Sequence, residues 1–243
     1  MAYSAKQVQE AVATAFIDPW TAYQAPVFTW LGATSDGLYY SDIAAQELES
    51  QIAKLDMLVP LRKSGFHHYG ETAKYSSDAI REEEHLVKKF HEFHSTNGGT
   101  RTALGRSVDF QIPLKPRRSK GEGRNIASSK FGKIDLVTFD EDSATLYLIE
   151  AKGQKSSKEG ILRPALEILT YRKLLDVECF AGEQKLPCAS NVSMTVLLHP
   201  DGKGLRHLRN LDRNGNTWSF LRKHFISVHE WQTMDDEFGI STI

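Results

Sequence analysis

The chain has 243 residues, of which 40% are hydrophobic and 25% charged, and its formal net charge is −1. This composition is typical of a globular protein with a substantial buried core, and it excludes the disordered, fibrous and disulfide-framed classes. A net charge near zero excludes a generally basic nucleic-acid-binding protein, so any nucleic-acid partner must be held by a local patch.

Cysteine usage and hydropathy bear on the compartment. Cys179 and Cys188 are the only cysteines, and neither has zinc-site spacing, so we interpret both as reduced thiols. No segment has the ~18–20 consecutive apolar residues of a membrane span. Polar residues also interrupt the first 16 positions, where a signal peptide would have its apolar core. The sequence therefore predicts a cytoplasmic protein without membrane contact. It contains no phosphate-binding glycine motif, so no nucleotide cofactor is expected.

Residues 1–75 are predicted to form an N-terminal helical extension. Apolar residues at helical spacing indicate a helix over residues 4–16, with Ser4 as its N-cap. An irregular, aromatic-rich stretch covers residues 20–40, and Ser41 is the candidate cap of a second helix that runs to about Leu55. This part carries no catalytic pattern. We expect it to pack on, or to regulate, the rest of the chain.

Residues 76–243 are predicted to form an α/β domain. A helix capped by Ser77 and running to His94 precedes a strand at 108–114. Two further β-rich runs, 133–139 and 145–151, are separated by a polar turn typical of a hairpin. The remaining predicted elements are a helix at about 162–175, a strand at 193–198, helices near 205–211 and 218–223, and a strand at 225–228. This order indicates a central mixed β-sheet flanked by helices.

Three polar residues interrupt the predicted hairpin. Asp135 is the lone acid in an apolar strand, and Glu150 and Lys152 lie at the end of the next strand. Residues i and i+2 of a strand point to the same side, so Glu150 and Lys152 share a face and the pairing brings Asp135 beside them. Converging carboxylates repel each other unless a cation lies between them, and their oxygens suit Mg²⁺. Such a metal polarises a phosphate oxygen and activates a water, while Lys152 offsets charge on the phosphorus.

Asp135 and Glu150-Ala151-Lys152 on consecutive strands, with a helix before and a helix after, resemble the PD-(D/E)xK, or restriction-endonuclease-like, superfamily of nucleases. The resemblance covers roughly residues 76–231. It implies that Asp135, Glu150 and Lys152 are catalytic. It also implies that Asp135, Glu150 and the carbonyl of Ala151 bind the metal.

Two positions depart from the family pattern. Ile134 stands in place of the leading proline, as in repair- and exonuclease-like branches. Glu167, one helical turn before Tyr171, stands where RecB-like members have glutamine.

Many members of the superfamily add a metal-binding glutamate from the preceding helix, and Glu82, Glu83 and Glu84 compete for that role. Helical phase favours Glu83, because it falls on the same stripe as Val87 and Phe90. Glu83 is therefore the predicted fourth member of the metal site.

Residues 115–133 form a predicted basic loop directly before the catalytic strand. It holds seven lysines and arginines against the single acid Glu122. Such a loop can follow a phosphate backbone. The predicted nucleic-acid-binding residues are Arg117, Arg118, Lys120 and Arg124.

The sequence thus predicts a Mg²⁺- or Mn²⁺-dependent nuclease that hydrolyses phosphodiester bonds in DNA, in a defence, restriction or repair setting. RNA as a substrate and a homodimeric state are left open. The alternative is a catalytically inactive protein of the same fold, either a nucleic-acid-binding module or a regulatory subunit whose contact surface is the aromatic stretch at residues 20–40.

Overall fold

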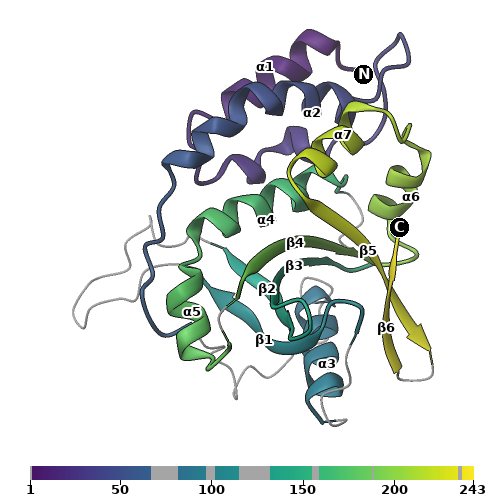
Figure 1. The fold of residues 1–243 in the computed structure, drawn as a ribbon. Helices are drawn as coiled ribbons and strands as arrows, with labels where there is room; N and C mark the ends of the chain where they lie inside the picture. The colour runs from purple at the N-terminus through teal and green to yellow at the C-terminus, as the bar shows by residue number, and fades with distance from the viewer. Residues whose placement is uncertain are drawn as a thin grey trace.

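The computed structural model describes residues 2–66, 82–96, 102–114, 132–154, 159–187, 189–234 and 237–243. Within these ranges a six-stranded mixed β-sheet forms the centre of the molecule, with the strands in sequence order (Figure 1). The strands are β1 (Arg106–Pro113), β2 (Lys133–Asp140), β3 (Thr145–Lys152), β4 (Asn191–Leu198), β5 (Ile226–Met234) and β6 (Glu237–Thr242). β1, β2 and β3 form an antiparallel meander, β3, β4 and β5 are parallel, and β6 returns antiparallel to β5.

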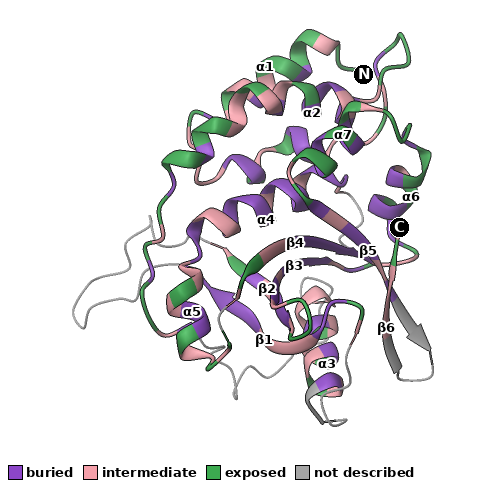
Figure 2. Ribbon diagram, in the orientation of Figure 1, coloured by how far each residue is buried: buried purple, intermediate pink, exposed green. Residues whose placement is uncertain are grey.

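Helices cover both faces of this sheet. The α-helices are α1 (Ala5–Ala15), α2 (Tyr40–Gln51), α3 (Glu82–Thr96), α4 (Leu162–Leu174), α5 (Val177–Glu183), α6 (Lys203–Asn210) and α7 (Asn216–Lys223), and the 3₁₀ helices are η1 (Ala22–Gln24), η2 (Pro26–Thr29) and η3 (Ile52–Met57). α3 packs on one face through Val87 and Phe90, which join Leu136 and Ile149 in a core of their own. α4 covers the opposite face and is buried along most of its length (Figure 2). The predicted α/β sheet with flanking helices is therefore confirmed.

The N-terminal helices form a second layer over α4. Ser4 caps α1 as predicted, in a reciprocal capping box with Gln7. η1 and η2 lie on α4, while α2 packs between α1 and α7. The side chains of this layer join those of α4 and the sheet in one continuous core. The predicted boundary at residues 75 and 76 falls outside the described residues.

Ser41 is not the N-cap of α2, contrary to the prediction. The helix begins at Tyr40, its N-cap position is Tyr39, and no side chain caps it. Ser41 is buried, and its Oγ lies 3.1 Å from Nε2 of His207 in α6. The hydroxyl that local sequence assigns to the helix end is thus engaged by a distant element.

The remaining predicted elements are present, with differences at their ends. α3 is described only from Glu82, so its predicted cap at Ser77 lies outside the described residues. α5 and β6 were not predicted, and β5 has nine residues instead of the expected four. No helix of the described part of the chain is both long and apolar enough to cross a bilayer.

Candidate active site

Asp135 lies at the point where β2 and β3 separate. At this end the pairing of the two strands finishes at Leu136 opposite Ile149, so Asp135 is one residue beyond it. Its side chain takes the place of a strand partner, because Oδ2 accepts a 3.0 Å hydrogen bond from the backbone N–H of Ala151. Asp135 is thereby fixed next to the residues that end β3.

β1 holds the second oxygen of this carboxylate. Gln111 donates from Nε2 to Oδ1 of Asp135 over 2.9 Å, and its own Oε1 lies 3.4 Å from Nζ of Lys133. The backbone of Gln111 has φ 52°, in the left-handed region that non-glycine residues seldom adopt. Such conformations persist where surrounding contacts hold them, and here the conformation accompanies a side chain that holds Asp135.

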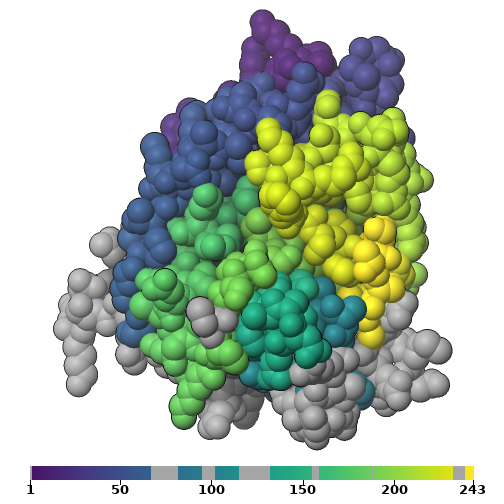
Figure 3. All heavy atoms as spheres, viewed as in Figure 1, coloured from purple at the N-terminus to yellow at the C-terminus, as the bar shows by residue number. Residues whose placement is uncertain are grey.

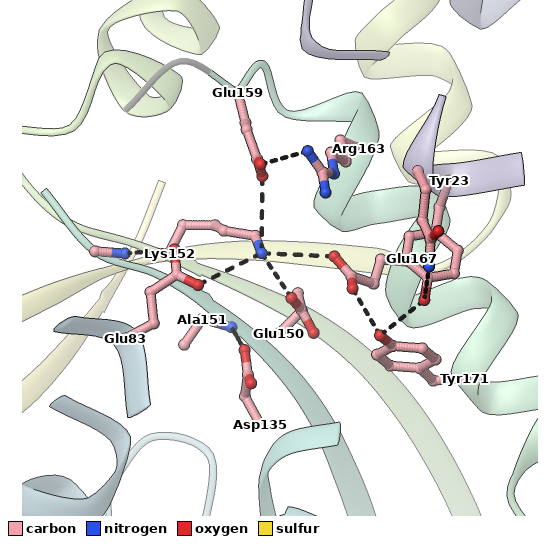
Figure 4. Close-up of polar contacts among 12 residues, drawn as sticks. Tyr23, Glu83, Asp135, Glu150, Ala151, Lys152, Glu159, Arg163, Glu167 and Tyr171 are labelled. Carbon is pink, nitrogen blue, oxygen red and sulfur yellow. Dashed lines mark hydrogen bonds and ion pairs between the residues drawn. The ribbon is translucent and has the colours of Figure 1, made fainter. Parts of the chain in front are cut away.

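Lys152 is the centre of the cluster. Its side chain is 14% exposed, and its ammonium faces four carboxylates (Figure 4). Nζ lies 2.8 Å from Glu150 Oε1, 3.5 Å from Glu167 Oε2, 3.8 Å from Glu83 Oε2 and 3.8 Å from Glu159 Oε2. Carboxylates from α3, from the end of β3, from α4 and from the residues before α4 therefore converge on one lysine.

Helix α3 contributes Glu83. Besides its contact with Lys152, Glu83 accepts a 3.3 Å hydrogen bond at Oε1 from the backbone N–H of Gly153. Glu82 lies beside it, since its Oε2 would be 2.7 Å from a β-carbon at Gly153. Glu83, which helical phase favours, thus contacts Lys152, and its place in a metal site stays a prediction.

Helix α4 connects the cluster to the N-terminal layer. Glu167 accepts a 2.6 Å hydrogen bond from the hydroxyl of Tyr171, one helical turn away. The hydroxyl oxygens of Tyr171 and Tyr23 are 3.4 Å apart, and their rings meet edge to face at 5.6 Å. A chain of polar contacts therefore runs from Lys152 through α4 to η1.

Burial and charge crowding shift the ionisation of the cluster. Burial raises the pKa of Asp135 to about 7, and the attraction of Lys152 offsets only part of that effect. Burial also raises the pKa of Glu150 well above its ordinary value, and the neighbouring carboxylates of Asp135 and Glu167 add to the shift. Burial alone would lower the pKa of Lys152, but the carboxylates around it outweigh burial and raise it well above its ordinary value. The carboxyl groups of Asp135 and Glu150 therefore resist ionising together, because burial and their mutual repulsion favour the protonated forms.

The donor set fits a hard divalent cation. The cations Lys152 and Arg163 face five carboxylates, those of Glu83, Asp135, Glu150, Glu159 and Glu167. Oε2 of Glu150 is buried and receives no hydrogen bond from the described residues. Clustered carboxylate oxygens are the donors that Mg²⁺ and Mn²⁺ select. Within the described ranges no three acidic, histidine or cysteine side chains already surround a common point, and the ammonium of Lys152 lies where the carboxylates converge.

A narrow crevice opens beside Lys152. It is lined by Gly153, Glu159 and His199 among others and has a volume of about 10 Å³. This is close to the volume that one water molecule needs. The crevice places room for a water beside Lys152 and Glu159.

The structure leaves one predicted group undescribed and adds three residues. Arg117, Arg118, Lys120 and Arg124 lie outside the described residues. Glu159, Gln111 and Tyr23 were not predicted. Of these, Glu159 alone had a local signal, since it stands four residues before Arg163 and forms a 2.6 Å ion pair with it.

The chain was compared with protein-family models, curated proteins and solved structures, and none of the three comparisons gives a match.

Proposed function

We propose that the protein is a Mg²⁺- or Mn²⁺-dependent nuclease with a restriction-endonuclease-like core, which hydrolyses phosphodiester bonds in DNA. The convergence of Glu83, Asp135 and Glu150 with Lys152 at the end of the β2–β3 hairpin carries this proposal. The element order α3, β1 to β3, α4, β4 supports it, because the PD-(D/E)xK pattern has a hairpin between two helices.

In this proposal Glu83, Asp135, Glu150 and the carbonyl of Ala151 hold the metal. When bound, it supplies Lewis-acid polarisation of the scissile phosphate and a lowered pKa for a coordinated water. Both oxygens of Asp135 are held, by the N–H of Ala151 and by Nε2 of Gln111, and Oε1 of Glu150 is held by Lys152, while Oε2 of Glu150 is available. The hydrogen bonds orient the carboxylates before any ligand arrives.

Lys152 acts on the reacting groups. Lys152 lines the water-sized crevice, and in this proposal its ammonium orients the attacking water and offsets the negative charge that grows on the phosphorus. Glu167 and Glu159 hold the ammonium in place from α4 and the residues before it. A substrate phosphate that approaches Lys152 replaces part of this carboxylate environment.

The basic loop supplies the DNA contact in this proposal, through Arg117, Arg118, Lys120 and Arg124. The sequence excess of positive charge before β2 supports this assignment. The setting is defence, restriction or repair, with DNA preferred over RNA as the substrate.

The test is a cleavage assay on linear, circular and single-stranded DNA and on single-stranded RNA, each with Mg²⁺, Mn²⁺ or excess EDTA. We expect cutting of DNA that requires the metal and stops on chelation. Cutting that survives EDTA, or no cutting of any substrate with either metal, contradicts the proposal.

A second candidate is a nucleic-acid-binding protein of the same fold without catalysis. One observation favours it: the ion pairs between Lys152 and Glu83, Glu150, Glu159 and Glu167 supply a cation to the cluster from within the chain. This candidate predicts salt-dependent DNA binding that neither needs nor responds to a divalent cation. Calorimetric titration with Mn²⁺ separates the two, because only the nuclease requires metal binding that Asp135→Asn weakens.

A further inference from the structure

We infer that an aromatic shelf beside the cluster binds the bases of an unpaired nucleic-acid strand, which makes the substrate of the proposed nuclease a DNA with a single-stranded segment. The shelf is defined as Tyr3, Trp30 and Tyr40. This inference rests on the proposed function for the role of the strand, and its test is independent of cleavage.

The shelf lines a large open cavity. The cavity measures about 600 Å³ and is bounded by the three aromatic rings, by Leu31 and by Lys203 at the start of α6. A volume of this size accommodates one or more nucleotides, given that ligand sites span ~300–1,000 Å³. The walls are apolar and aromatic, and their charged group is a lysine.

The rings have the geometry of base stacking. Tyr3 and Trp30 lie parallel, with ring centroids 3.9 Å apart and an angle of 3° between the planes. Tyr40 meets both rings nearly edge-on, at 5.9 Å from Tyr3 and 6.1 Å from Trp30. Tyr3 nevertheless remains 41% exposed, so it presents aromatic surface to which a base can add. Flat nucleobases stack on such surfaces whatever their sequence, because every base has a π-face.

Lys203 gives this surface the positive charge that a phosphate-binding site needs. It is exposed, and no carboxylate of the described residues lies within ion-pair distance of its ammonium. A cation beside an aromatic shelf is the combination that single strands require, because the phosphate contacts position the backbone while the bases stack. An uncharged peptide or lipid would occupy the aromatic rings without using the lysine.

The shelf adjoins the cluster around Lys152. Gly204, next to Lys203, borders the crevice beside Lys152, and a β-carbon at Gly204 would lie 3.1 Å from the carbonyl of Glu159. On the same side, a β-carbon at Gly160 would lie 3.3 Å from Leu31, which lines the shelf cavity. Figure 1 shows α6 and the N-terminus on the same side of the molecule. A strand cut at Lys152 therefore reaches the shelf by passing the start of α6.

The test measures binding in EDTA, where the proposed nuclease cannot cut. Fluorescence anisotropy compares a labelled oligothymidylate of about 12 nucleotides with an abasic strand of equal length and with a blunt duplex. We expect wild type to prefer the oligothymidylate. Tyr3→Ala should weaken that binding about fivefold or more and leave binding of the abasic strand unchanged, and Tyr3→Phe should retain full affinity.

Lys203→Ala should weaken binding of the oligothymidylate and the abasic strand alike and reduce the slope of log affinity against log salt by ~0.7. The matched controls are Phe225→Ala, which removes an 82% exposed aromatic ring between α7 and β5, and Lys54→Ala in η3. Both should bind as wild type does.

Three outcomes overturn the inference: no binding of the oligothymidylate by wild type, unchanged binding by Tyr3→Ala, or an equal loss on the abasic strand. If the protein cleaves DNA in a metal-dependent way and any of these outcomes is observed, the inference about the shelf is wrong and the proposed nuclease activity is supported. If binding depends on Tyr3 and no cleavage occurs, the inference about the shelf is supported and the proposed nuclease activity is wrong.

Discussion

The three hairpin residues have separable roles. Asp135→Asn and Glu150→Gln keep side-chain shape but remove charge, so both should lower Mn²⁺ affinity and abolish cleavage. Lys152→Ala should still bind Mn²⁺ while turnover falls about a hundredfold or more, since lost charge stabilisation in the transition state amounts to ~3 kcal/mol. Calorimetry and a cleavage assay on the same preparations measure both properties.

Glu141→Gln is the matched control, because Glu141 lies at the turn of the same hairpin and pairs with Arg106 at the surface. It should leave metal affinity and turnover unchanged. Normal cleavage by Lys152→Ala, or wild-type metal affinity in Asp135→Asn, would show that the roles are assigned wrongly.

Tyr171 is expected to stabilise the cluster through Glu167. Tyr171→Phe removes the 2.6 Å hydrogen bond to a carboxylate that is 12% exposed. We expect the free energy of unfolding to fall by ~1–3 kcal/mol, the range for a buried group left without its partner. Tyr23→Phe should lower it less, because the oxygen–oxygen distance of 3.4 Å is at the limit of a hydrogen bond.

Urea denaturation of the two variants measures this order. Tyr147→Phe, on β3, is the control, and its ring lies in the other core cluster with α3. A Tyr23→Phe variant that loses as much stability as Tyr171→Phe would contradict the polar chain from Lys152 to η1.

Between elements, α2 caps α7. The N-cap position of α7 is Gly215, which has no side chain, and Asp42 Oδ1 accepts hydrogen bonds from Thr217 N at 2.8 Å and Thr217 Oγ1 at 2.7 Å. A carboxylate at a helix N-terminus satisfies open N–H groups and interacts favourably with the helix dipole.

Asp42→Ala should therefore lower the free energy of unfolding by ~1–2 kcal/mol, and Asp42→Asn by less, because its amide oxygen still accepts. Chemical denaturation measures both. Glu10→Ala on α1 serves as the control: its ion pair with Lys6 is exposed, and such pairs contribute ~0–1 kcal/mol. Equal effects of Asp42→Ala and Glu10→Ala would rule out the cap.

Much of the element order was visible in the sequence because it depends on local periodicity. The two apolar runs that predicted the β2–β3 hairpin follow from a sheet covered on both faces: Leu148 faces the core under α4 and Ile149 faces the core under α3. β6 was missed because it is an edge strand whose partner, β5, is itself longer than its apolar run indicates. α5 has seven residues, too few for a clear helical period.

The residues of the candidate site likewise divide into those that local sequence predicts and those that it does not. Asp135, Glu150 and Lys152 share a hairpin, and Glu83 follows from the phase of one helix. Tyr23 contacts Tyr171 from 148 positions away, and no local pattern encodes such a contact. Gln111 was not predicted as a site residue, because its role depends on a left-handed backbone in the middle of a strand.

At the scale of the whole molecule, the N-terminal layer and the sheet domain present one continuous surface (Figure 3). His207 in α6 joins them, through Ser41 and through an edge contact with Tyr39 at 5.8 Å. Burial lowers the pKa of His207 below its ordinary value of 6.5, and Asp42 opposes that effect only in part.

The stability contributed by the contact between α6 and the N-terminal layer should therefore depend on pH. Below about pH 6.5 the unfolded chain binds a proton at this position that the folded protein resists, so stability is full above that pH and falls as the pH drops toward the folded-state pKa. His207→Gln should flatten the decline between about pH 6.5 and 5, as thermal denaturation across that range would show. His85→Gln, at an exposed position of α3, should leave the decline in place. If the stability of both variants falls with pH as that of wild type does, protonation of His207 does not control the contact between α6 and the N-terminal layer.

The capping contact between Asp42 and Thr217 has a consequence for folding during synthesis. The two residues are 175 positions apart, so a ribosome that adds ~5–20 residues per second makes Thr217 about 9 to 35 seconds after Asp42. For that interval α2 lacks α7, and for most of it α4 is missing too, so the core around Val8, Val12 and Leu48 lacks part of its cover. The segment that completes the N-terminal layer is translated long after the layer's own helices. The beginning of the chain must therefore be kept from aggregating until the last helix arrives.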